Sequence, residues 1–557
     1  MEITNNSELT SDDVHGQILD HFGLISAKMD QLNLIKNIDT KIPVSSNKGS
    51  KVSMGERVAA MVLNGLGFVN DRLYMFPDFL ENKAVDVLFD KNIKASDFND
   101  DALGRCLDAI HKYGTSKFVS EIALEIGKEE GLLGKCTHVD TTTLTVYGDY
   151  NNETTKGAIP KHGYSKQKRM DLKQVVLLLA TTGKAGLPVW MCSHNGNASD
   201  QKTLLEASKR IDLFYNQLKG APSFIYVADS AMYNSCIKDN SNISWLSRVP
   251  ENIKKSSLLL EQDSGDFSWS GVDGLDGYKI SATTSDYGGI KQRWLLVYSE
   301  QAFKRESKTL DKRISKELED KTKELNKLSK QVIGCYQDAQ KIAKELKKTI
   351  KYHSVTFTYE AIYGYSKKGK PKPDALKEIK GYKIIGSLEQ DKEKILLVRR
   401  KKGRFILATN ELSIKKLSDT EILTEYKDQS QVERGFKFIK DDTFELDSIF
   451  LKKPERIDAL MAVMTITLMV YNLSQHHLRE SLKKTNESLL NQLKKPTQKP
   501  TIKWIFKKFE GVQVLYVNLG DKTKRIVINV SPFMKQVVRH FGDKAMKIYE
   551  TGGFSCS

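Results

Sequence analysis

The sequence predicts an α/β fold, in which a mixed core is interrupted by a large α+β insertion and preceded by a helical domain. Between about residues 135 and 250, β-branched and apolar runs alternate with two helical patterns. Residues 9 to about 125 instead place apolar residues at helical spacing. About 150 residues then separate Val249 from the next core strand at Phe405, far more than a simple connection needs. An inserted domain is therefore expected there.

The N-terminal domain, residues 1–130, is expected to be helical. Val58, Val62 and Leu66 recur at helical spacing, and Asn99 is placed to cap a helix that starts at about Ala102. The first hundred residues hold ten basic and fifteen acidic side chains, a net charge of −5. Two roles stay open for this domain: a helix-turn-helix that grips DNA, and a scaffold for protein contacts.

Seven elements follow in the order strand, strand, strand, helix, strand, helix, strand. Their expected ranges are 136–148, 172–181, 189–193, 200–217, 224–229, 233–238 and 244–249. A Gly- and Pro-containing turn at 182–188 joins the second and third strands into a hairpin. This order is that of the ribonuclease-H-like fold, which carries acidic residues on its first strand and just after its fourth. Asp140 and Asp229 stand at those two places.

The catalytic core is thus assigned to residues 131–250 and 405–480, and the inserted domain to 251–404. Inside the insertion, strands are expected at 279–282, 294–299, 384–385 and 395–399. Its middle is a charged helix or helical hairpin, along which apolar residues from Leu325 to Leu346 alternate by three and four. Two interpretations of this seam remain, an intermolecular coiled coil and a helix packed on its own domain.

After the insertion, one helix is expected from Thr424 to about Lys440, and an apolar helix from Pro454 to Leu473. The apolar stretch within the second is too short and too polar to span a bilayer, which predicts a buried helix. Residues 481–557 are expected to form a linker, up to about 500, and a small C-terminal unit. Strands are predicted there near 512–517 and 525–530.

The net charge of +17 favours a polyanionic partner, because phosphate contacts release condensed counterions. Since the first hundred residues are acidic, the rest carries +22, including basic clusters at 367–373 and 399–404. A solvated turn is the alternative for each cluster, but together they favour contacts to a nucleic-acid backbone. The six cysteines are scattered without a CxxC pair, which indicates a reducing cytosol. The first residues show no signal-peptide pattern, so we expect a cytoplasmic, nucleoid-associated protein.

Three carboxylates stand in settings that suit metal-assisted phosphodiester chemistry: Asp140 and Asp229 on strands, and Glu433 on a helix. Such a set suits two Mg²⁺ ions, for which Mn²⁺ is expected to substitute. An Asp in the middle of a strand is costly to bury without a role. Each of the others has a simpler explanation, since Asp229 can cap the next turn and Glu433 can be an exposed helix residue.

Tyr426, Gln429, Glu433 and Lys440 fall at the spacing Y-x2-R-x3-E-x6-K, with Gln in the place of Arg. In this the chain resembles a large group of DDE transposases from bacterial insertion sequences, and the resemblance runs from about residue 10 to 535. Further segments that resemble one branch of the group are 64–68, 140–142, 403–410 and 449–457.

The resemblance implies that Asp140, Asp229 and Glu433 hold the metal ions. It implies that Tyr426, Gln429 and Lys440 hold DNA phosphates, with Gln429 lacking the charge and fork of an arginine. Arg434, close by, is a candidate to compensate. The implied partners are double-stranded DNA, as element ends and as target, and a second copy in a homodimer; no membrane is implied.

Relatives with such an insertion often use an aromatic residue to hold a flipped base, which makes Trp269 and Trp294 candidates. A place in the core of the inserted domain is the alternative for each. His138 shares a strand face with Asp140 and is expected to be a packed histidine, and His194 is placed in a turn.

The expected function is therefore transposition: end cleavage, then strand transfer by the new 3′-hydroxyl. A second interpretation is a catalytically weak DNA-binding relative that regulates transposition, favoured by Gln429. A third is another ribonuclease-H-like nuclease such as a resolvase, which leaves the helix signature and the insertion unexplained.

Overall fold

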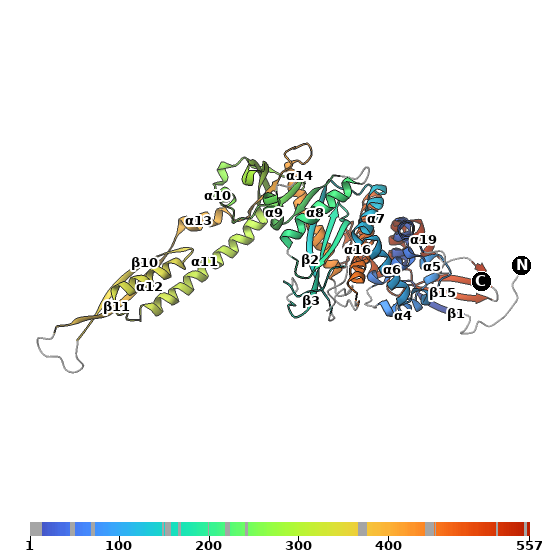
Figure 1. Ribbon diagram of the computed structural model, residues 1–557, viewed down its shortest axis with the longest axis horizontal. Helices are drawn as coiled ribbons and strands as arrows, with labels where there is room; N and C mark the ends of the chain where they lie inside the picture. Colours follow the sequence, from blue (N-terminus) through green and yellow to red (C-terminus); the bar gives the residue numbers. More distant parts are fainter. Residues whose placement is uncertain are drawn as a thin grey trace. The chain divides into compact units, whose positions relative to one another are not determined.

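The computed structural model describes residues 14–44, 51–67, 73–146, 150, 157–164, 169–198, 200–217, 223–239, 243–365, 376–440, 451, 453–519, 522–550 and 554–556. The chain forms two compact units. The first comprises Met1–Trp245 and Glu425–Ser557, and the second Leu246–Thr424. The sequence elements of each unit can be followed by colour in Figure 1.

A mixed sheet lies at the centre of the first unit. Its strands are β2 (Cys136–Val146), β3 (Lys173–Thr182), β4 (Leu187–Asn195) and β5 (Ile225–Ala228), in the order β4-β3-β2-β5. The first three are antiparallel, and β5 runs parallel to β2. Helices α8 (Asp200–Asn216) and α9 (Ser230–Asp239) fall where helices were predicted, so these strand and helix predictions are confirmed. His194 lies within β4, and its expected place in a turn is wrong.

The single helix predicted from Thr424 to Lys440 is two helices, α14 (Asp419–Asp428) and α15 (Ser430–Ile439). Gln429 stands between them. Its amide donates to the carbonyl of Tyr426, three residues back, and its own carbonyl accepts from Val432, three residues on. The same carbonyl also accepts from the amide of Glu433, four residues on, at 3.5 Å. Three-residue hydrogen bonds thus join the four-residue pattern at this junction, where no Gly or Pro stands.

Helix α16 (Pro454–Thr485) is longer than predicted, because Leu478 and Leu482 continue the buried face beyond Leu473. By length and composition it is the one helix of the described residues able to cross a membrane, but 83% of its apolar window is buried inside the protein. The prediction of a buried helix is confirmed, whereas the argument from short length is wrong. The expected linker is helical up to Thr485 and then holds the small pair β13 (Leu489–Leu490) and β14 (Pro496–Thr497).

The N-terminal segment is mostly helical, as expected. Its helices are α1 (Phe22–Gln31), α2 (Leu34–Lys41), α3 (Met54–Leu66), α4 (Phe76–Glu81), α5 (Val85–Phe89), α6 (Asp100–Tyr113) and α7 (Thr115–Glu129). Asn99 caps α6 as predicted, accepting a hydrogen bond from the amide of Ala102 at 2.9 Å. A capping box of Ser53 and Glu56 starts α3.

The two ends of the chain share a four-stranded sheet, which the sequence did not predict. Strand β1 (Val14–Ile18) pairs antiparallel with β15 (Gln513–Leu519), followed by β16 (Lys522–Ile528) and β17 (Phe554–Cys556). Helices α17 (Ile502–Lys508), α18 (Pro532–Phe541) and α19 (Asp543–Tyr549) complete this region. The strands predicted near 512–517 and 525–530 are confirmed as β15 and β16.

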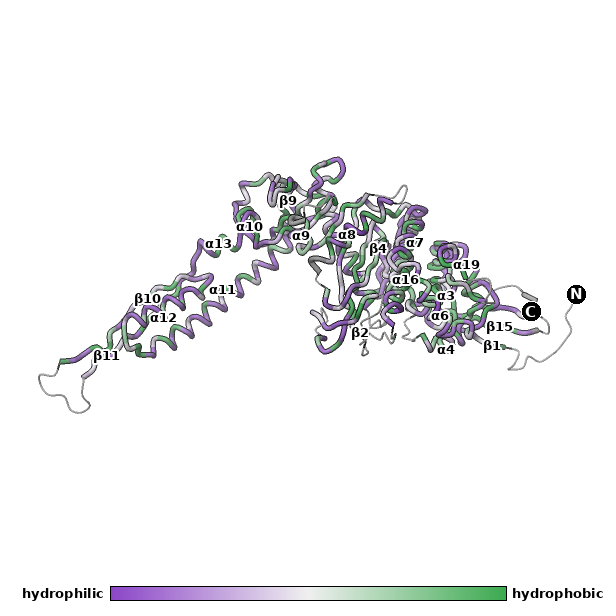
Figure 2. Tube along the Cα trace, viewed as in Figure 1, coloured by the Kyte–Doolittle hydropathy of each residue, from purple (hydrophilic) through white to green (hydrophobic). Residues whose placement is uncertain are grey.

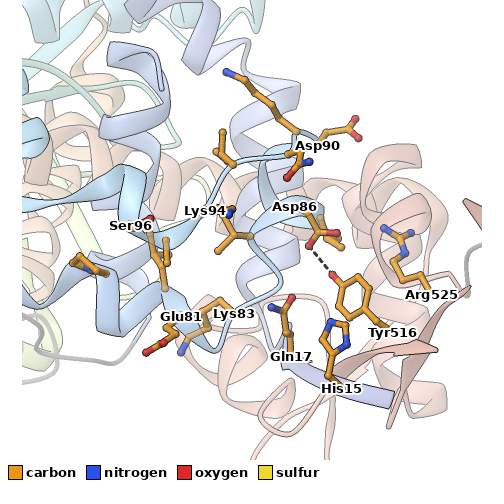
Figure 3. A pocket seen from close by; sticks show the side chains of 18 of the residues that line it. His15, Gln17, Glu81, Lys83, Asp86, Asp90, Lys94, Ser96, Tyr516 and Arg525 are labelled. Atoms are coloured by element: carbon orange, nitrogen blue, oxygen red, sulfur yellow. Dashed lines mark hydrogen bonds between the residues drawn. The ribbon is translucent and has the colours of Figure 1, made fainter. Parts of the chain in front are cut away.

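A cavity of about 1120 Å³ lies between the N-terminal helices and the C-terminal strands. Figure 3 shows side chains that line it. The Tyr516 hydroxyl donates to Asp86 at 2.6 Å, and the His15 ring stacks on Tyr516 with centroids 4.8 Å apart. Asp90 pairs with Lys544 at 2.9 Å. Because these polar groups already satisfy one another across the two segments, we interpret the cavity as part of their packing.

Five strands of the second unit lie side by side in the order β6-β12-β9-β8-β7. Their bounds are β6 (Trp245–Arg248), β12 (Arg404–Thr409), β9 (Gln292–Ser299), β8 (Tyr278–Ser285) and β7 (Ser270–Gly271). Helix α10 (Lys254–Glu261) precedes β7. The strand predicted at 395–399 is wrong: these residues lie in helix α13 (Lys392–Arg400), which Asp391 caps by accepting from the amide of Lys394 at 3.1 Å. The cap overrides the β-propensity of the apolar run.

Two helices and a long hairpin extend this unit. They are α11 (Glu300–Leu328), α12 (Tyr336–Lys348), β10 (His353–Gly364) and β11 (Glu378–Gln390). The apolar seam is divided between α11 and α12, and Leu325, Ala339 and Leu346 pack with Ile384 of β11 in one core cluster. The buried part of the seam therefore packs on its own domain, while Val332 and Ile342 are exposed. Figure 2 shows the mostly hydrophilic course of α11.

Candidate active site

Asp140 is the only residue of β2 that is not buried. Its neighbours His138 and Thr142 are 2% and 3% exposed. The carboxylate accepts a hydrogen bond from the amide of Thr141 at 2.7 Å and remains half-buried. The acidic side chain of β2 is thus the one that solvent reaches, in agreement with the high cost of burying a carboxylate.

Asp229 follows β5 directly and lies beside Asp140 in the register of the sheet. The parallel pairing of β2 with β5 includes His138 opposite Val227, so two further residues along each strand bring Asp140 and Asp229 to the same level. Adjacent strands are about 4.8 Å apart. Asp229 is exposed, and it accepts from the amide of Ala231 at 2.9 Å, so it also caps α9.

The face of the sheet on which Asp140 lies is covered by α14 and α15. Asp140 is directly opposite Leu179 of β3, and directly opposed residues of antiparallel strands share a face. A Cβ on Gly435 of α15 would lie 3.4 Å from Leu179. His138, on the same face, places Nε2 3.4 Å from the carboxylate of Glu425 in α14. His138 is thus a packed histidine, as expected, with a partner that the sequence did not reveal.

Glu433 stands in the first turn of α15 and is exposed. Because α15 packs on the face of the sheet on which Asp140 lies, Glu433 is carried on that same side. Within the described residues, however, no group of three or more His, Cys, Asp or Glu side chains is close enough to hold a metal ion. The donor types fit a hard divalent cation. The structure brings the two aspartates to the same level on neighbouring strands and α15 to the face of Asp140, without closing the three carboxylates into one cluster.

The remaining signature residues follow the break between the two helices. Tyr426 belongs to α14, Gln429 is the junction, and Lys440 directly follows α15. Tyr426, Gln429 and Lys440 are half-buried, and Arg434 on α15 is exposed.

The two tryptophan candidates differ clearly. Trp294 is 1% exposed, and its indole donates to Gln292 at 2.9 Å, so it is a core residue. Trp269 is half-buried and lines a cavity of about 420 Å³ in the second unit, together with Tyr298 and Phe303.

The basic cluster at 399–404 is largely neutralised inside its own unit. Arg399 pairs with Asp311 at 2.6 Å, and Arg400 with Asp263 at 2.7 Å. Arg404 is 7% exposed and donates to the carbonyl of Gln262 at 2.7 Å. The expectation that this cluster contacts nucleic acid is therefore replaced by a structural role. The other cluster, 367–373, lies outside the described residues, as do 68, 449–450 and 452 of the resembling segments.

Comparison with known proteins assigns the class. Residues 133–473 match the family described as Transposase DDE domain, and the match covers more than half of the chain. The chain therefore belongs to the DDE transposases, a family of DNA transposases that cleave DNA and transfer strands. Residues 14–124 match a second family, described as Domain of unknown function (DUF4277).

Among solved structures, the chain is similar to a piggyBac transposase synaptic complex with hairpin DNA. The identity is 10% and the TM-score 0.32, over 88% of this chain and 80% of that one, and a likeness at this level carries no argument. The comparison with curated proteins gave no match.

Proposed function

We propose that this protein is the transposase of a bacterial insertion sequence, which binds the ends of its element, cleaves them and joins the 3′-hydroxyl ends to target DNA. Membership of the DDE transposases supports the reaction class. The observation that carries the residue assignment is the register of β2 and β5, since it brings Asp140 and Asp229 to the same level on neighbouring strands.

In this proposal Asp140, Asp229 and Glu433 are the catalytic carboxylates and would hold two Mg²⁺ ions, with Mn²⁺ as a substitute. Bound divalent cations would stabilise the charge that develops on the attacking and leaving oxygens. Asp140 is held in place by the amide of Thr141, and Asp229 by that of Ala231. Glu433 would approach from α15, which packs on the same face of the sheet.

The DNA would lie along α14 and α15, where Tyr426, Gln429 and Lys440 would contact phosphates. We propose Trp269 as the residue that holds a flipped base, because its cavity is also lined by aromatic rings and by the cations Lys279 and Lys402. A homodimer that synapses two ends, acting in the cytoplasm, is part of the same proposal.

Cleavage of a labelled duplex carrying one element end tests the assignment. Asp140→Asn keeps the size of the side chain and one oxygen for the Thr141 amide, but removes the charge. We expect cleavage to fall at least about 100-fold while DNA binding persists. Asp276→Asn, an exposed site in the second unit, is the matched control and should cleave as the wild type does. Equal cleavage by Asp140→Asn and the wild type would refute the role of Asp140.

The second candidate function is that of a catalytically weak, regulatory DNA-binding relative. Gln429 favours it, since it stands at the break between α14 and α15 without the charge of an arginine. The same assay separates the two functions: binding of the element end without cleavage in Mg²⁺ or Mn²⁺ would favour the regulatory relative.

A further inference from the structure

A basic pocket lies beside α15 in the first unit, with a volume of about 380 Å³. Four elements contribute to it: the turn between β3 and β4, helix α15, helix α16 and the start of α17. The cationic or titratable bases that line it are Lys184, Arg434, Lys437, His476, Arg479 and Lys503. Among its described lining residues there is no Asp or Glu.

Three of the cations of this pocket, on α15 and on the turn between β3 and β4, have no acidic partner among the described residues. Lys184, Arg434 and Lys437 are exposed, and none of them forms an ion pair in the part of the chain that the structure describes. Arg479 is half-buried and donates through Nε to the carbonyl of Pro500 at 2.9 Å. Burial, and then the charge of Arg434, lower the pKa of Arg479 below its usual value. An anion in the pocket would relieve this mutual repulsion.

The pocket is held by hydrogen bonds that position its walls. Asn472 of α16 donates to the carbonyl of Gly186 at 2.9 Å and so fixes the turn that carries Lys184. That turn uses φ of +68° at Gly183 and +63° at Gly186, which glycine adopts without strain. The amide of Ile502 donates to Oε1 of Gln475 at 3.2 Å, which anchors the start of α17 next to Lys503.

The position of the pocket on α15 relates it to the proposed chemistry. Lys437 follows Glu433 by four residues, which places both on neighbouring positions of one helix face. Arg434 lies about 140° around the helix from Gln429, at 100° per residue. Arg434 therefore lies on a different side of the helix from Gln429. It lines the basic pocket, whose other walls come from α16, the start of α17 and the turn between β3 and β4.

We propose that this pocket binds a backbone phosphate of the DNA beside the bond to be cleaved, with Lys184, Arg434 and Arg479 as its principal ligands. The identity of the partner as DNA rests on the proposed function. The pocket differs from the signature positions Tyr426, Gln429 and Lys440, none of which lines it.

Binding of an element-end duplex at several salt concentrations tests this inference. Lys184→Gln and Arg434→Gln alter exposed side chains, so we expect both variants to fold as the wild type does. Each should weaken binding and reduce the slope of log K against log salt by about 0.9, as expected for one lost phosphate contact. Lys312→Gln, at an exposed lysine of α11, is the matched control and should change neither. Wild-type affinity and slope in both pocket variants would overturn the proposal.

Duplexes with a neutral methylphosphonate at single positions locate the phosphate. The wild-type protein should bind more weakly to the duplex with a methylphosphonate at one position near the cleavage site than to the unmodified duplex. The Arg434→Gln variant should show no further loss of affinity from the methylphosphonate at that position. If inorganic phosphate binds to the wild type and no methylphosphonate position distinguishes the two proteins, the pocket takes a free anion, and the DNA assignment is wrong.

The binding and cleavage assays together test the pocket and the proposed function separately. Weakened binding by the pocket variants with no metal-dependent cleavage by the wild type would support the pocket and refute the transposase activity. Asp140-dependent cleavage with unchanged binding by the pocket variants would support the transposase activity and refute the pocket.

Discussion

At the scale of single residues, Asp458 is a buried carboxylate that the proposed chemistry does not use. It lies in the first turns of α16 and is 6% exposed. It accepts hydrogen bonds from the hydroxyl of Ser193 in β4 and from the amide of Ala158. Burial raises its pKa above the ordinary 3.8, the two hydrogen bonds and His111 oppose that rise, and Glu455 adds to it. Asp458 thus joins α16 to the central sheet while carrying an unfavourable charge.

The sign of its pH dependence follows from linkage. Because the pKa is higher in the folded state, the fold binds this proton more tightly than the unfolded chain does. The resulting stability is present below about pH 4 and is lost as the pH rises through the raised pKa. Asp458→Asn does not titrate, so its free energy of unfolding relative to the wild type should increase over this range. Denaturant unfolding at several pH values measures the difference, and a pH-independent difference would contradict the assignment.

At the scale of elements, the sequence predicted what depends on local pattern. β2 and β3 were found because runs such as Val175 to Leu179 have few alternatives to a buried strand. The break at Gln429 was missed because it carries no Gly or Pro, and α13 because Asp391, its cap, lies outside the apolar run. Two of the candidate carboxylates could be placed by strand order. The pocket around Arg479 could not, since its walls come from segments far apart in the sequence.

The division of the apolar seam between α11 and α12 gives a prediction for the second unit. Leu325 is 5% exposed and packs against Gly386 of β11, where an added Cβ would lie 2.5 Å from its side chain. Leu325→Ala should therefore destabilise this unit by about 2–5 kcal/mol. Because the seam is used within the chain, the oligomeric state should not change.

Thermal unfolding and sedimentation measure these two outcomes. Leu318→Ala, at a site on the same helix that is 40% exposed, is the control and should leave both nearly unchanged. Dissociation of an assembly by Leu325→Ala, without loss of stability, would instead indicate an intermolecular coiled coil.

At the scale of the whole molecule, the first unit is assembled from both ends of the chain. The amides of Leu19 and Asp20 donate to the carbonyl of Val512 at 3.0 Å, next to the pairing of β1 with β15. A Cβ on Gly23 of α1 would lie 2.7 Å from Ile548. The N-terminal segment that matches a domain of unknown function thus depends on the last fifty residues for part of its core.

Removal of residues 501–557 should therefore unfold the N-terminal segment, although this segment is complete in the shortened chain. The deletion takes away the strand paired with β1 and the ring of Phe506 that stacks on the buried His21, with centroids 4.8 Å apart. Edge strands and apolar helix faces left uncovered in this way promote aggregation. Hydrogen exchange should show loss of protection in α1 and α3, while the second unit, whose core cluster lies within 325–384, keeps its protection. Removal of residues 1–13, all before β1, is the control and should leave α1 protected. Native protection of α1 in the chain that ends at residue 500 would contradict this prediction. It would show that the N-terminal helices fold independently of the C-terminal strands and helices.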